Sequence, residues 1–294
     1  MEPVTDWLIT GAGVAVVLAA LRDIFHTLWH PSGRSGFSRQ IMAAVWRAGR
    51  PRRGRRRVSV LAGPLSMVVV VLAWVAFIVL GWTLVYWPHL DDGFFISEGL
   101  QETSRGGFPD ALYLSMVTVA TLGFGDIVPT DEWLRIAVPT QALLGFALLT
   151  AAVTWVLQIY PALTRRRALA IRLSLLGRAD AVRVLAGEDV PMAANLLEDI
   201  AGELVQARVD LTQYAETYYF RDGDASASLA ATIGTAVDLA HAAERSPRAD
   251  LRFAGTLLDL ALGDFARLVD EQFLRVGAPP RAVLSAYAAD HGHG

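Results

Sequence analysis

Two long stretches without a charged residue dominate the hydrophobic pattern of the chain, residues 58–88 and 136–163. A helix needs about 20 apolar residues to cross a hydrocarbon core of about 30 Å, and both stretches are longer than that. Trp82, Tyr86 and Trp87 cluster at the far end of the first stretch, as in the aromatic belt of a membrane interface. The pattern predicts one transmembrane helix over 58–88 and another over 134–163.

A third apolar stretch, residues 7–21, is shorter and continues as an amphipathic segment. The acidic start MEPVTD does not suit a signal peptide, which needs a positive leading region. Residues 1–30 are therefore expected to form an additional transmembrane helix, with a helix lying in the membrane interface as the alternative.

The remaining residues, 164–294, mix acids and arginines and carry helical periodicity, which predicts an all-helical domain. One helix is expected after Pro191, others over about 226–245 and 248–275, and a short one after Pro280, with a turn at 222–226. An apolar stripe is expected to be core or an interface between subunits: Leu251, Leu258, Leu262, Phe265, Leu268 and Val269. Packing is the expected role of Tyr214, Tyr218, Tyr219 and Phe220, and a frayed tail is expected for His291 and His293.

Charge is segregated along the chain and predicts its orientation. Residues 31–57 contain nine arginines and no acid, whereas residues 89–110 contain five acids and one arginine. Under the positive-inside rule, the basic loop 31–57 and the C-terminal domain are cytoplasmic, and residues 89–135 face the outside of a plasma membrane. Anionic lipid headgroups, rather than nucleic acid, are the expected partner of the arginines nearest the membrane helix. These are Arg52, Arg53, Arg55, Arg56 and Arg57.

Between the two charge-free stretches lies a short apolar segment followed by a glycine-rich one, TLGFGD. Residues 109–120 predict a helix of about three turns, which is too short to cross a membrane and is therefore re-entrant. Gly123 and Gly125 permit positive φ at alternate residues, so that successive carbonyls can point the same way. A row of carbonyl oxygens of this kind can replace the hydration shell of a cation.

The residues Thr118, Thr121, Gly123, Phe124, Gly125 and Asp126 form the pattern T-x-x-T-x-G-F-G-D. This pattern, with its flanking helices, resembles the pore of the tetrameric potassium channels over about residues 60–165. The resemblance implies an all-α pore-loop membrane protein with a filter over 121–126. It implies K⁺ ligands at the main-chain oxygens of Thr121, Leu122, Gly123 and Phe124 and at the Thr121 hydroxyl.

The resemblance also implies roles around the filter. Tyr113 is expected to bond Asp126 beside the filter, and Gly145 is expected to be a hinge of the inner helix. Phe146, Leu149 and Val153 are expected to line a cavity, with a bundle crossing near 157–161. One loop per chain implies a homotetramer. Leu122 stands where valine is usual and is expected to pack behind the filter, and Phe124 replaces a commoner tyrosine.

Two other functions stay open: a weakly selective cation channel, if the phenylalanine filter deforms, and a membrane-anchored sensor or scaffold with a vestigial pore. No nucleophile–base pair, metal-ligand spacing or cysteine suggests an enzyme or an organic cofactor. No transmembrane segment carries the arginine repeat of a voltage sensor, and no nucleotide-binding glycine motif follows a strand. The sequence therefore leaves the gating ligand unknown.

Overall fold

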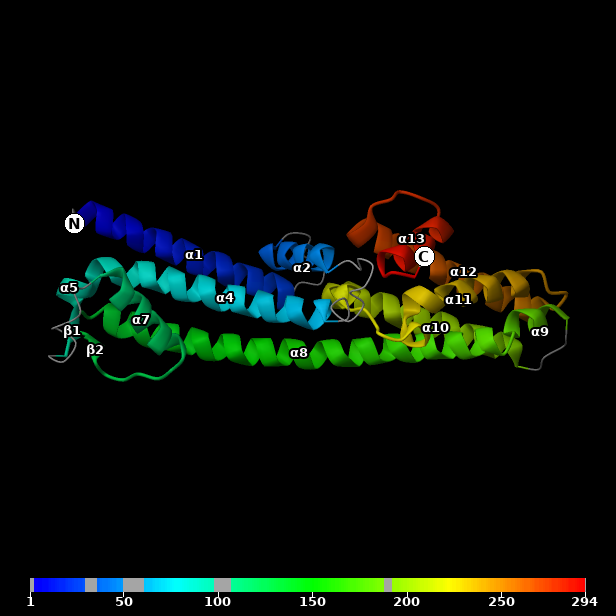
Figure 1. Cartoon of the computed structure of the whole chain (residues 1–294), viewed down its shortest axis with the longest axis horizontal. Coiled ribbons are helices and arrows are strands. Elements are labelled where there is room, and N and C mark those ends of the chain that lie inside the picture. The colour runs from blue at the N-terminus through cyan, green and yellow to red at the C-terminus, as the bar shows by residue number, and fades with distance from the viewer. Residues whose placement is uncertain (1–2, 30–35, 50–60, 98–106, 188–191, 294) are drawn as a thin grey trace. The chain divides into compact units, whose positions relative to one another are not determined.

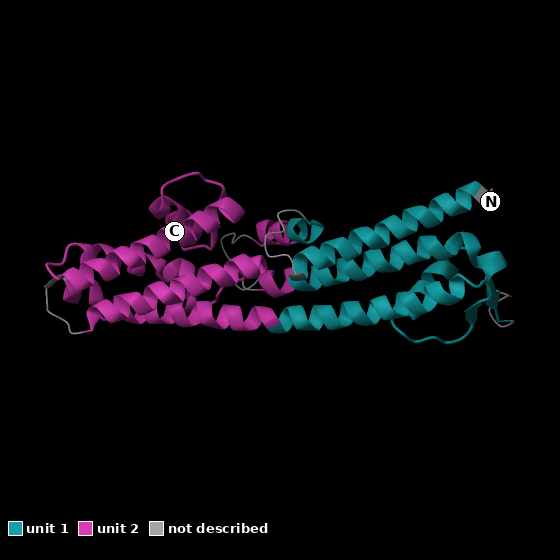
Figure 2. Cartoon of the chain, turned by 180° about the vertical axis from the view of Figure 1, so that it is seen from behind, with its two compact units in different colours: residues 1–41, 67–157 teal, residues 42–66, 158–294 magenta. Residues whose placement is uncertain are grey.

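The computed structural model describes residues 3–29, 36–49, 61–97, 107–187 and 192–293 (Figure 1). The described residues are almost entirely helical, which confirms the predicted all-α membrane fold. Three helical segments are long and apolar enough to cross a membrane: Val4–Leu28, Ala62–Gly93 and Glu132–Arg178. The chain divides into two compact units, residues 1–41 with 67–157 and residues 42–66 with 158–294 (Figure 2).

The first unit contains the elements predicted around the glycine-rich loop. Helix α1 spans Pro3–Trp29, α4 spans Ala62–Tyr86, α7 spans Phe108–Val119 and α8 begins at Leu134. A 3-10 turn, Trp87–His89, and a short helix α5, Leu90–Gly93, follow α4. The strands β1, Phe94–Ile96, and β2, Ile127–Pro129, pair antiparallel with Phe95 opposite Val128. Sequence reasoning missed this small sheet because each strand has only three residues.

Helix α8 spans Leu134–Arg178, so its predicted end at residue 163 was wrong. The arginines after residue 164 end the apolar stretch but not the helix. Pro161 lies inside α8, and the residues after it are good helix formers. Leu169, Ala170 and Leu173 are buried, so packing supports the helix beyond the apolar stretch.

The basic segment 31–57 was predicted to be a loop. This prediction was wrong in part, because the segment contains helix α2, Phe37–Ala48. Ser38, Met42 and Trp46 follow at intervals of four residues and are all buried, which is the spacing of one helix face. The density of arginines obscured this periodicity in the sequence. The arginines expected at lipid headgroups, Arg52 to Arg57, lie outside the described residues.

A buried carboxylate joins three helices of the first unit. Asp23 on α1 is 5% exposed and accepts hydrogen bonds from the Ser38 hydroxyl of α2 and from Trp74 Nε1 of α4, the latter at 2.8 Å. The Trp74 ring lies 5.3 Å from the ring of Trp155 on α8. Polar side chains in apolar surroundings are costly to leave without a partner, so this network favours one arrangement of α1, α2 and α4.

Helices α1 and α4 also approach closely through two glycines. A Cβ atom at Gly13 would lie 2.5 Å from the Gly81 carbonyl oxygen, and a Cβ at Gly81 would lie 2.7 Å from Val17 Cγ2. Small residues at such a crossing let two backbones meet, which is how membrane helices gain packing energy. A side chain at either position would force the helices apart.

Substitution of Gly13 is therefore expected to destabilise the protein. Gly13→Val places branched carbons against the α4 backbone, and overpacking of this kind costs about 1–3 kcal/mol. The thermal unfolding midpoint of the detergent-purified protein should fall. Gly11→Val is the matched control, because a Cβ at Gly11 meets nothing within 4 Å. Equal effects of the two substitutions would contradict close packing at Gly13.

The second unit contains the predicted C-terminal helices and, before them, a short helix α9 that was not predicted. It contains α9 (Ala181–Gly187), α10 (Ala193–Gln213), α11 (Leu229–Glu244), α12 (Ala249–Val269) and α13 (Pro280–Asp290). Short turns of 3-10 helix, η2 (Ala215–Tyr219) and η3 (Ala225–Ala227), and a π-helical turn η4 (Asp270–Leu274) join them. The α12 stripe from Leu251 to Val269 is buried, and so are Tyr218, Tyr219 and Phe220, which confirms that these residues pack in the core.

The prediction of a frayed tail at His291 was wrong. The His291 side chain is buried, with Nε2 3.0 Å from the Tyr218 carbonyl oxygen and Nδ1 3.1 Å from the Tyr287 carbonyl oxygen. Burial, and next the charge of Arg166, lower the pKa of His291 to about 4. Proximity to the chain end suggested disorder, whereas contacts made by α13 hold this residue in the core.

This burial predicts a loss of stability in acid. Unfolded His291 regains an ordinary pKa of about 6.5, so between about pH 6.5 and 4 the unfolded state binds more protons than the folded state. Unfolding therefore becomes easier as the pH falls through that window, with little change above it. The measurement is the thermal unfolding midpoint at about pH 7 and pH 5. His291→Gln should weaken this pH dependence, whereas the control His293→Gln should retain it.

Candidate ion-conducting site

The site begins with helix α7, whose ends are fixed by local chemistry. Pro109 suits the first helical turn, where its missing N–H has no partner to lose. The Asp110 carboxylate accepts from the Gly107 backbone N–H at 3.2 Å and lies at the positive end of the helix dipole. At the other end, the Leu122 N–H donates to the Val117 carbonyl at 3.0 Å, and the chain leaves the helix.

The next five residues form a backbone of alternating hand. Thr121, Gly123 and Gly125 have φ of 57°, 56° and 78°, whereas Leu122 and Phe124 do not have positive φ. A Cβ at Gly123 or Gly125 would meet nothing within 4 Å. The conformation, rather than a lack of space, therefore requires glycine at these two positions.

Thr121 adopts the same left-handed conformation although its side chain is β-branched, which sequence reasoning did not anticipate. Such a residue costs on the order of 1–3 kcal/mol and persists only where its surroundings hold it in place. Its N–H donates to the Thr118 carbonyl at 2.9 Å, and Thr118 is buried. Strain at the first filter position is consistent with a functional constraint on this backbone.

The carbonyl oxygens of residues 121–125 are free in the described part of the chain. No backbone or side-chain hydrogen bond there ends on any of the five, and all five residues are exposed. Carbonyl groups at membrane depth need a partner, because lipid supplies none. The arrangement therefore presents a short run of oxygens that can coordinate a cation.

Beyond the filter, Asp126 makes the predicted bond. The Tyr113 hydroxyl donates to Asp126 Oδ2 at 2.6 Å, and the Ile127 backbone N–H donates to Oδ1 at 3.1 Å. The Ser97 N–H donates to the Asp126 carbonyl at 2.9 Å, which ties the filter exit to the strand pair β1–β2. The outer end of the filter is thus anchored to α7 and to the sheet at once.

Sequence reasoning missed a second anchor behind α7. Gln141 on α8 donates from Nε2 to the Ser115 carbonyl at 3.0 Å and to the Ser115 hydroxyl at 2.8 Å. Its Oε1 accepts from the Tyr86 hydroxyl of α4 at 2.8 Å, and Ser115 Oγ donates to the Val79 carbonyl at 2.9 Å. All three polar side chains are fully buried. The only signal of this network in the sequence was a polar glutamine within the apolar stretch 136–163, which also contains Gln158.

The inner-helix residues lie where the pore resemblance implies, although their roles stay predictions. Gly145 falls inside continuous α8, and a Cβ there would lie 2.3 Å from the Val119 carbonyl oxygen. The close approach of α8 to the end of α7 therefore requires glycine at position 145. Phe146, Leu149 and Val153 are exposed at intervals typical of one helix face.

Two filter side chains are also exposed. Leu122 is 59% and Phe124 is 64% exposed, so the expectation that Leu122 packs behind the filter is not met within one chain. Of the acids expected near the outer mouth, Asp91 and Asp92 lie in α5, and Glu98 and Glu102 lie outside the described residues.

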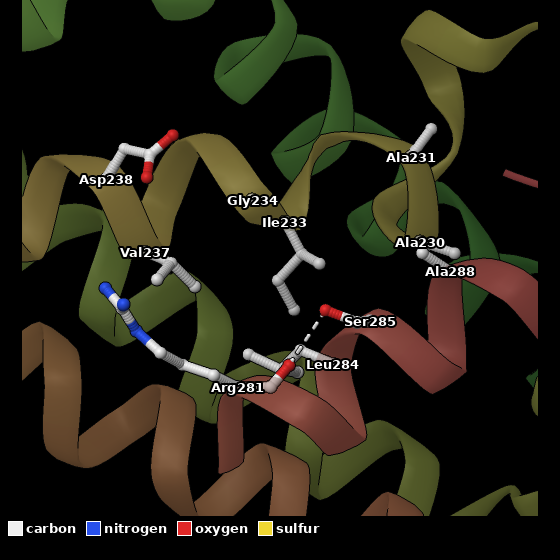
Figure 3. Close-up of a pocket in the computed structure, with 10 residues that line it drawn as sticks. All are labelled: Ala230, Ala231, Ile233, Gly234, Val237, Asp238, Arg281, Leu284, Ser285 and Ala288. Atoms are coloured by element: carbon white, nitrogen blue, oxygen red, sulfur yellow. Dashed lines mark hydrogen bonds between the residues drawn. The ribbon is translucent and has the colours of Figure 1, made fainter. Parts of the chain in front are cut away.

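A groove of about 440 Å³ lies between α11 and α13 in the second unit (Figure 3). Small residues such as Ala230, Gly234 and Ala288 line it, with Asp238 and Arg281 among the polar lining residues. Both charged side chains are exposed, and no cluster of three metal-ligating side chains occurs anywhere among the described residues.

Comparison with known proteins agrees with the geometry of the first unit. Residues 65–161 match the family model described as ion channel, and this stretch contains α7, most of α4 and the beginning of α8. This match points to transport rather than catalysis.

Two curated proteins are similar to the chain. The "Uncharacterized membrane protein YdjJ" of Bacillus subtilis is 27% identical over 168 residues, which is 56% of this chain and 48% of that protein. The "Putative potassium channel protein RPA4233" of Rhodopseudomonas palustris is 26% identical over 138 residues, 46% of this chain and 33% of that protein. The chain thus spans half or less of the length of these relatives. No solved structure matches it.

The buried network behind α7 predicts a specific loss of stability. Gln141→Leu keeps most of the side-chain volume but leaves the Tyr86 hydroxyl and the Ser115 carbonyl without this partner, at about 1–3 kcal/mol. The thermal unfolding midpoint of the purified protein should fall accordingly. Thr140→Ala is the control, because the hydroxyl of exposed Thr140 donates within its own helix, to the Ile136 carbonyl at 2.8 Å. A midpoint that Gln141→Leu leaves unchanged would argue against the network.

Proposed function

We propose that this protein is a potassium-selective channel that conducts K⁺ passively through a homotetramer. The observation that carries the proposal is the filter backbone, with positive φ at Thr121, Gly123 and Gly125 and with five carbonyl oxygens that accept no hydrogen bond from the described residues. Dehydrated K⁺ is coordinated by such oxygens in channels that carry this pattern. A match to the ion channel family and similarity to a protein named as a putative potassium channel support it.

The proposed ligands are the main-chain oxygens of Thr121, Leu122, Gly123 and Phe124, together with the Thr121 hydroxyl. One chain contributes a single row of oxygens, which covers only one side of an ion. Four copies around a shared axis would complete the coordination shell. A cyclic tetramer of this kind needs only one type of interface between subunits. The exposed side chains of Leu122 and Phe124 would then pack against neighbouring copies.

The proposed path continues below the filter. Helix α7 ends at the filter, so the negative end of its dipole favours a cation beneath it. Phe146, Leu149 and Val153 would line the cavity there, and the helix α8 continues past the proposed crossing at 157–161. Apolar walls leave the ion hydrated until it reaches the carbonyl oxygens.

Charge distribution supports the proposed orientation. Basic residues 31–57 and the arginines after residue 164 favour the cytoplasmic side of a plasma membrane, which would leave α5 on the outside. The C-terminal helices would then be cytoplasmic. Anionic lipid headgroups would neutralise the arginine cluster at 52–57.

The phenylalanine of the filter defines the alternative function, a weakly selective cation channel. Phe124 lacks a hydroxyl that could bond a neighbouring helix, which removes one restraint on the filter. The bond from Tyr113 to Asp126 and the bonds of Asp126 to the strand pair supply other restraints within the chain. Selectivity is expected because the backbone supplies the ligands and remains anchored at its outer end.

Reversal potentials in proteoliposomes under opposing K⁺ and Na⁺ gradients test the proposal. Wild-type protein should reverse near the K⁺ equilibrium potential. Gly123→Ala should abolish K⁺ flux, because alanine disfavours the positive φ although its Cβ has room. Gly202→Ala in α10 is the control, since its Cβ also meets nothing and its φ is not positive.

Each other outcome points to a defined alternative. Equal K⁺ and Na⁺ permeability would favour the weakly selective channel. Absence of flux from purified tetramers would favour a sensor or scaffold with a vestigial pore. A mass measurement that gives another subunit number would overturn the homotetramer.

A further inference from the structure

One irregular segment of the second unit, residues 214–222, contacts several parts of the chain that are distant in sequence. It comprises η2, Ala215–Tyr219, and the extended residues that follow as far as Asp222, and we call it the junction loop. Tyr218, Tyr219 and Phe220 are all buried. Buried irregular backbone needs polar partners, and their identity shows what the loop connects.

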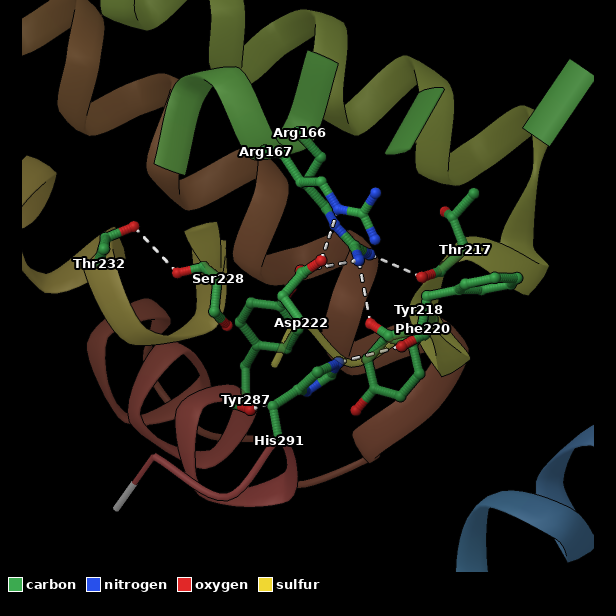
Figure 4. A network of polar contacts seen from close by, with 10 residues as sticks. All are labelled: Arg166, Arg167, Thr217, Tyr218, Phe220, Asp222, Ser228, Thr232, Tyr287 and His291. Atoms are coloured by element: carbon green, nitrogen blue, oxygen red, sulfur yellow. Dashed lines mark hydrogen bonds and ion pairs between the residues drawn. The ribbon is translucent and has the colours of Figure 1, made fainter. Parts of the chain in front are cut away.

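The first connection is to α8 (Figure 4). The buried Arg166 guanidinium donates to the Thr217 carbonyl at 2.6 Å and to the Phe220 carbonyl at 2.9 Å. Arg167 Nε donates to Asp222 Oδ1 at 2.6 Å, and the Asp222 side chain is 4% exposed. A buried guanidinium that loses its partners is strongly disfavoured, so α8 and the junction loop are expected to move together.

The second connection is to the beginning of α4. A Cβ atom at Gly63 would lie 2.7 Å from Phe220 Cγ, so the Phe220 ring rests directly on the α4 backbone. Gly63 belongs to the same compact unit as the junction loop. The loop therefore touches the first turn of one helix of the pore module and the continuation of the other.

The third connection is to α2, through Trp46. Its ring, 4% exposed, lies 5.8 Å from the Tyr219 ring and 5.0 Å from the His291 ring, with the Arg221 guanidinium 3.7 Å from its centre. Trp46 Nε1 donates to Asp290 Oδ2 at 2.9 Å. A tryptophan face under a guanidinium gains cation–π energy in addition to its buried area.

The last connection is to α13, at the far end of the sequence. The Tyr218 hydroxyl donates to the same Asp290 oxygen at 2.8 Å, and His291 contacts the Tyr218 carbonyl. Burial, and next the charge of Asp290, raise the pKa of the Tyr218 hydroxyl well above its ordinary value, so it stays a donor. Rearrangement of α13 would therefore displace the junction loop.

We propose that the junction loop couples the C-terminal helices to the pore by holding the first turn of α4 and the Arg166 region of α8 in a fixed relation. This inference rests on the proposed channel function. A change in the spacing of α4 and α8 must separate Phe220 from Gly63 or release Arg166 from the loop. The loop thus sets how far the two helices can move, and α13 can alter that limit.

The absence of cysteine from the chain permits a clean test by cross-linking. A Cβ at position 63 would lie 2.7 Å from Phe220 Cγ, so cysteines at positions 63 and 220 are close neighbours and suitable for a disulfide cross-link. Gly63→Cys with Phe220→Cys is reconstituted as full-length protein, and K⁺ flux is measured after oxidation and after reduction. Locking the contact should change the flux at least about fivefold, the lower range of coupling between sites, and reduction should reverse the change.

Two controls separate coupling from the chemistry of the cross-link. Each single-cysteine variant should show no response to oxidation. A second pair, Gly177→Cys with Thr235→Cys, joins α8 to α11 away from α4, where a Cβ at Gly177 would lie 3.7 Å from Thr235 Cγ2. Flux should be unchanged when this pair is oxidised.

The outcomes distinguish the two proposals. A complete 63–220 cross-link with unchanged flux would overturn the coupling and leave the channel intact. Wild-type protein without flux would overturn the channel and the coupling with it. If the reduced double variant does not conduct, Phe220→Ala decides: it should change flux by a comparable factor, whereas exposed Phe253→Ala should not. Equal flux in these two variants would overturn the coupling.

Discussion

The loop of residues 121–125 leaves five consecutive carbonyl oxygens without a hydrogen bond from the described residues, and the proposed channel function depends on this feature. A helix or a sheet would consume these groups, so the segment has to be irregular, and irregular backbone survives at membrane depth only when protein surrounds it. The alternating hand of residues 121–125 is one solution, and it places Thr121 in a strained conformation. The neighbouring helices supply the restraint: α7 ends at the loop, Gly145 lets α8 approach Val119, and Asp126 is tied to Tyr113.

The parts of the fold that follow from local chemistry could be predicted from the sequence. The length of the uncharged stretches predicted the membrane helices, and Pro109 predicted the start of α7. The two glycines predicted positive φ at positions 123 and 125. The bond between Tyr113 and Asp126 was implied by the resemblance to the potassium channel family, and the structure contains it. Charge was a less reliable guide to where helices begin and end. The many arginines led to a predicted loop where α2 lies and to a predicted helix end at residue 163, where α8 continues.

The features that were missed depend on contacts between distant residues. Gln141 meets Ser115 and Tyr86, which are 26 and 55 positions away, and nothing in its own neighbourhood reveals either partner. His291 was assigned to a frayed end because sequence shows proximity to a terminus but not burial by α13. Thr121 was missed for another reason: its left-handed backbone is an exception to residue preference, imposed by what surrounds it.

The proposed filter and the junction loop are both irregular segments of backbone, and they differ in whether their carbonyl oxygens accept hydrogen bonds. In the junction loop the carbonyls of Thr217 and Phe220 are taken up by a buried guanidinium, so the segment is fixed to α8. In the filter the carbonyls are left without a donor from the described residues, so a cation can occupy that role. A fixed segment can transmit movement, whereas an unsatisfied one can bind and release an ion, and the continuous helix α8 belongs to both arrangements. The coupling proposed above would run along this shared helix.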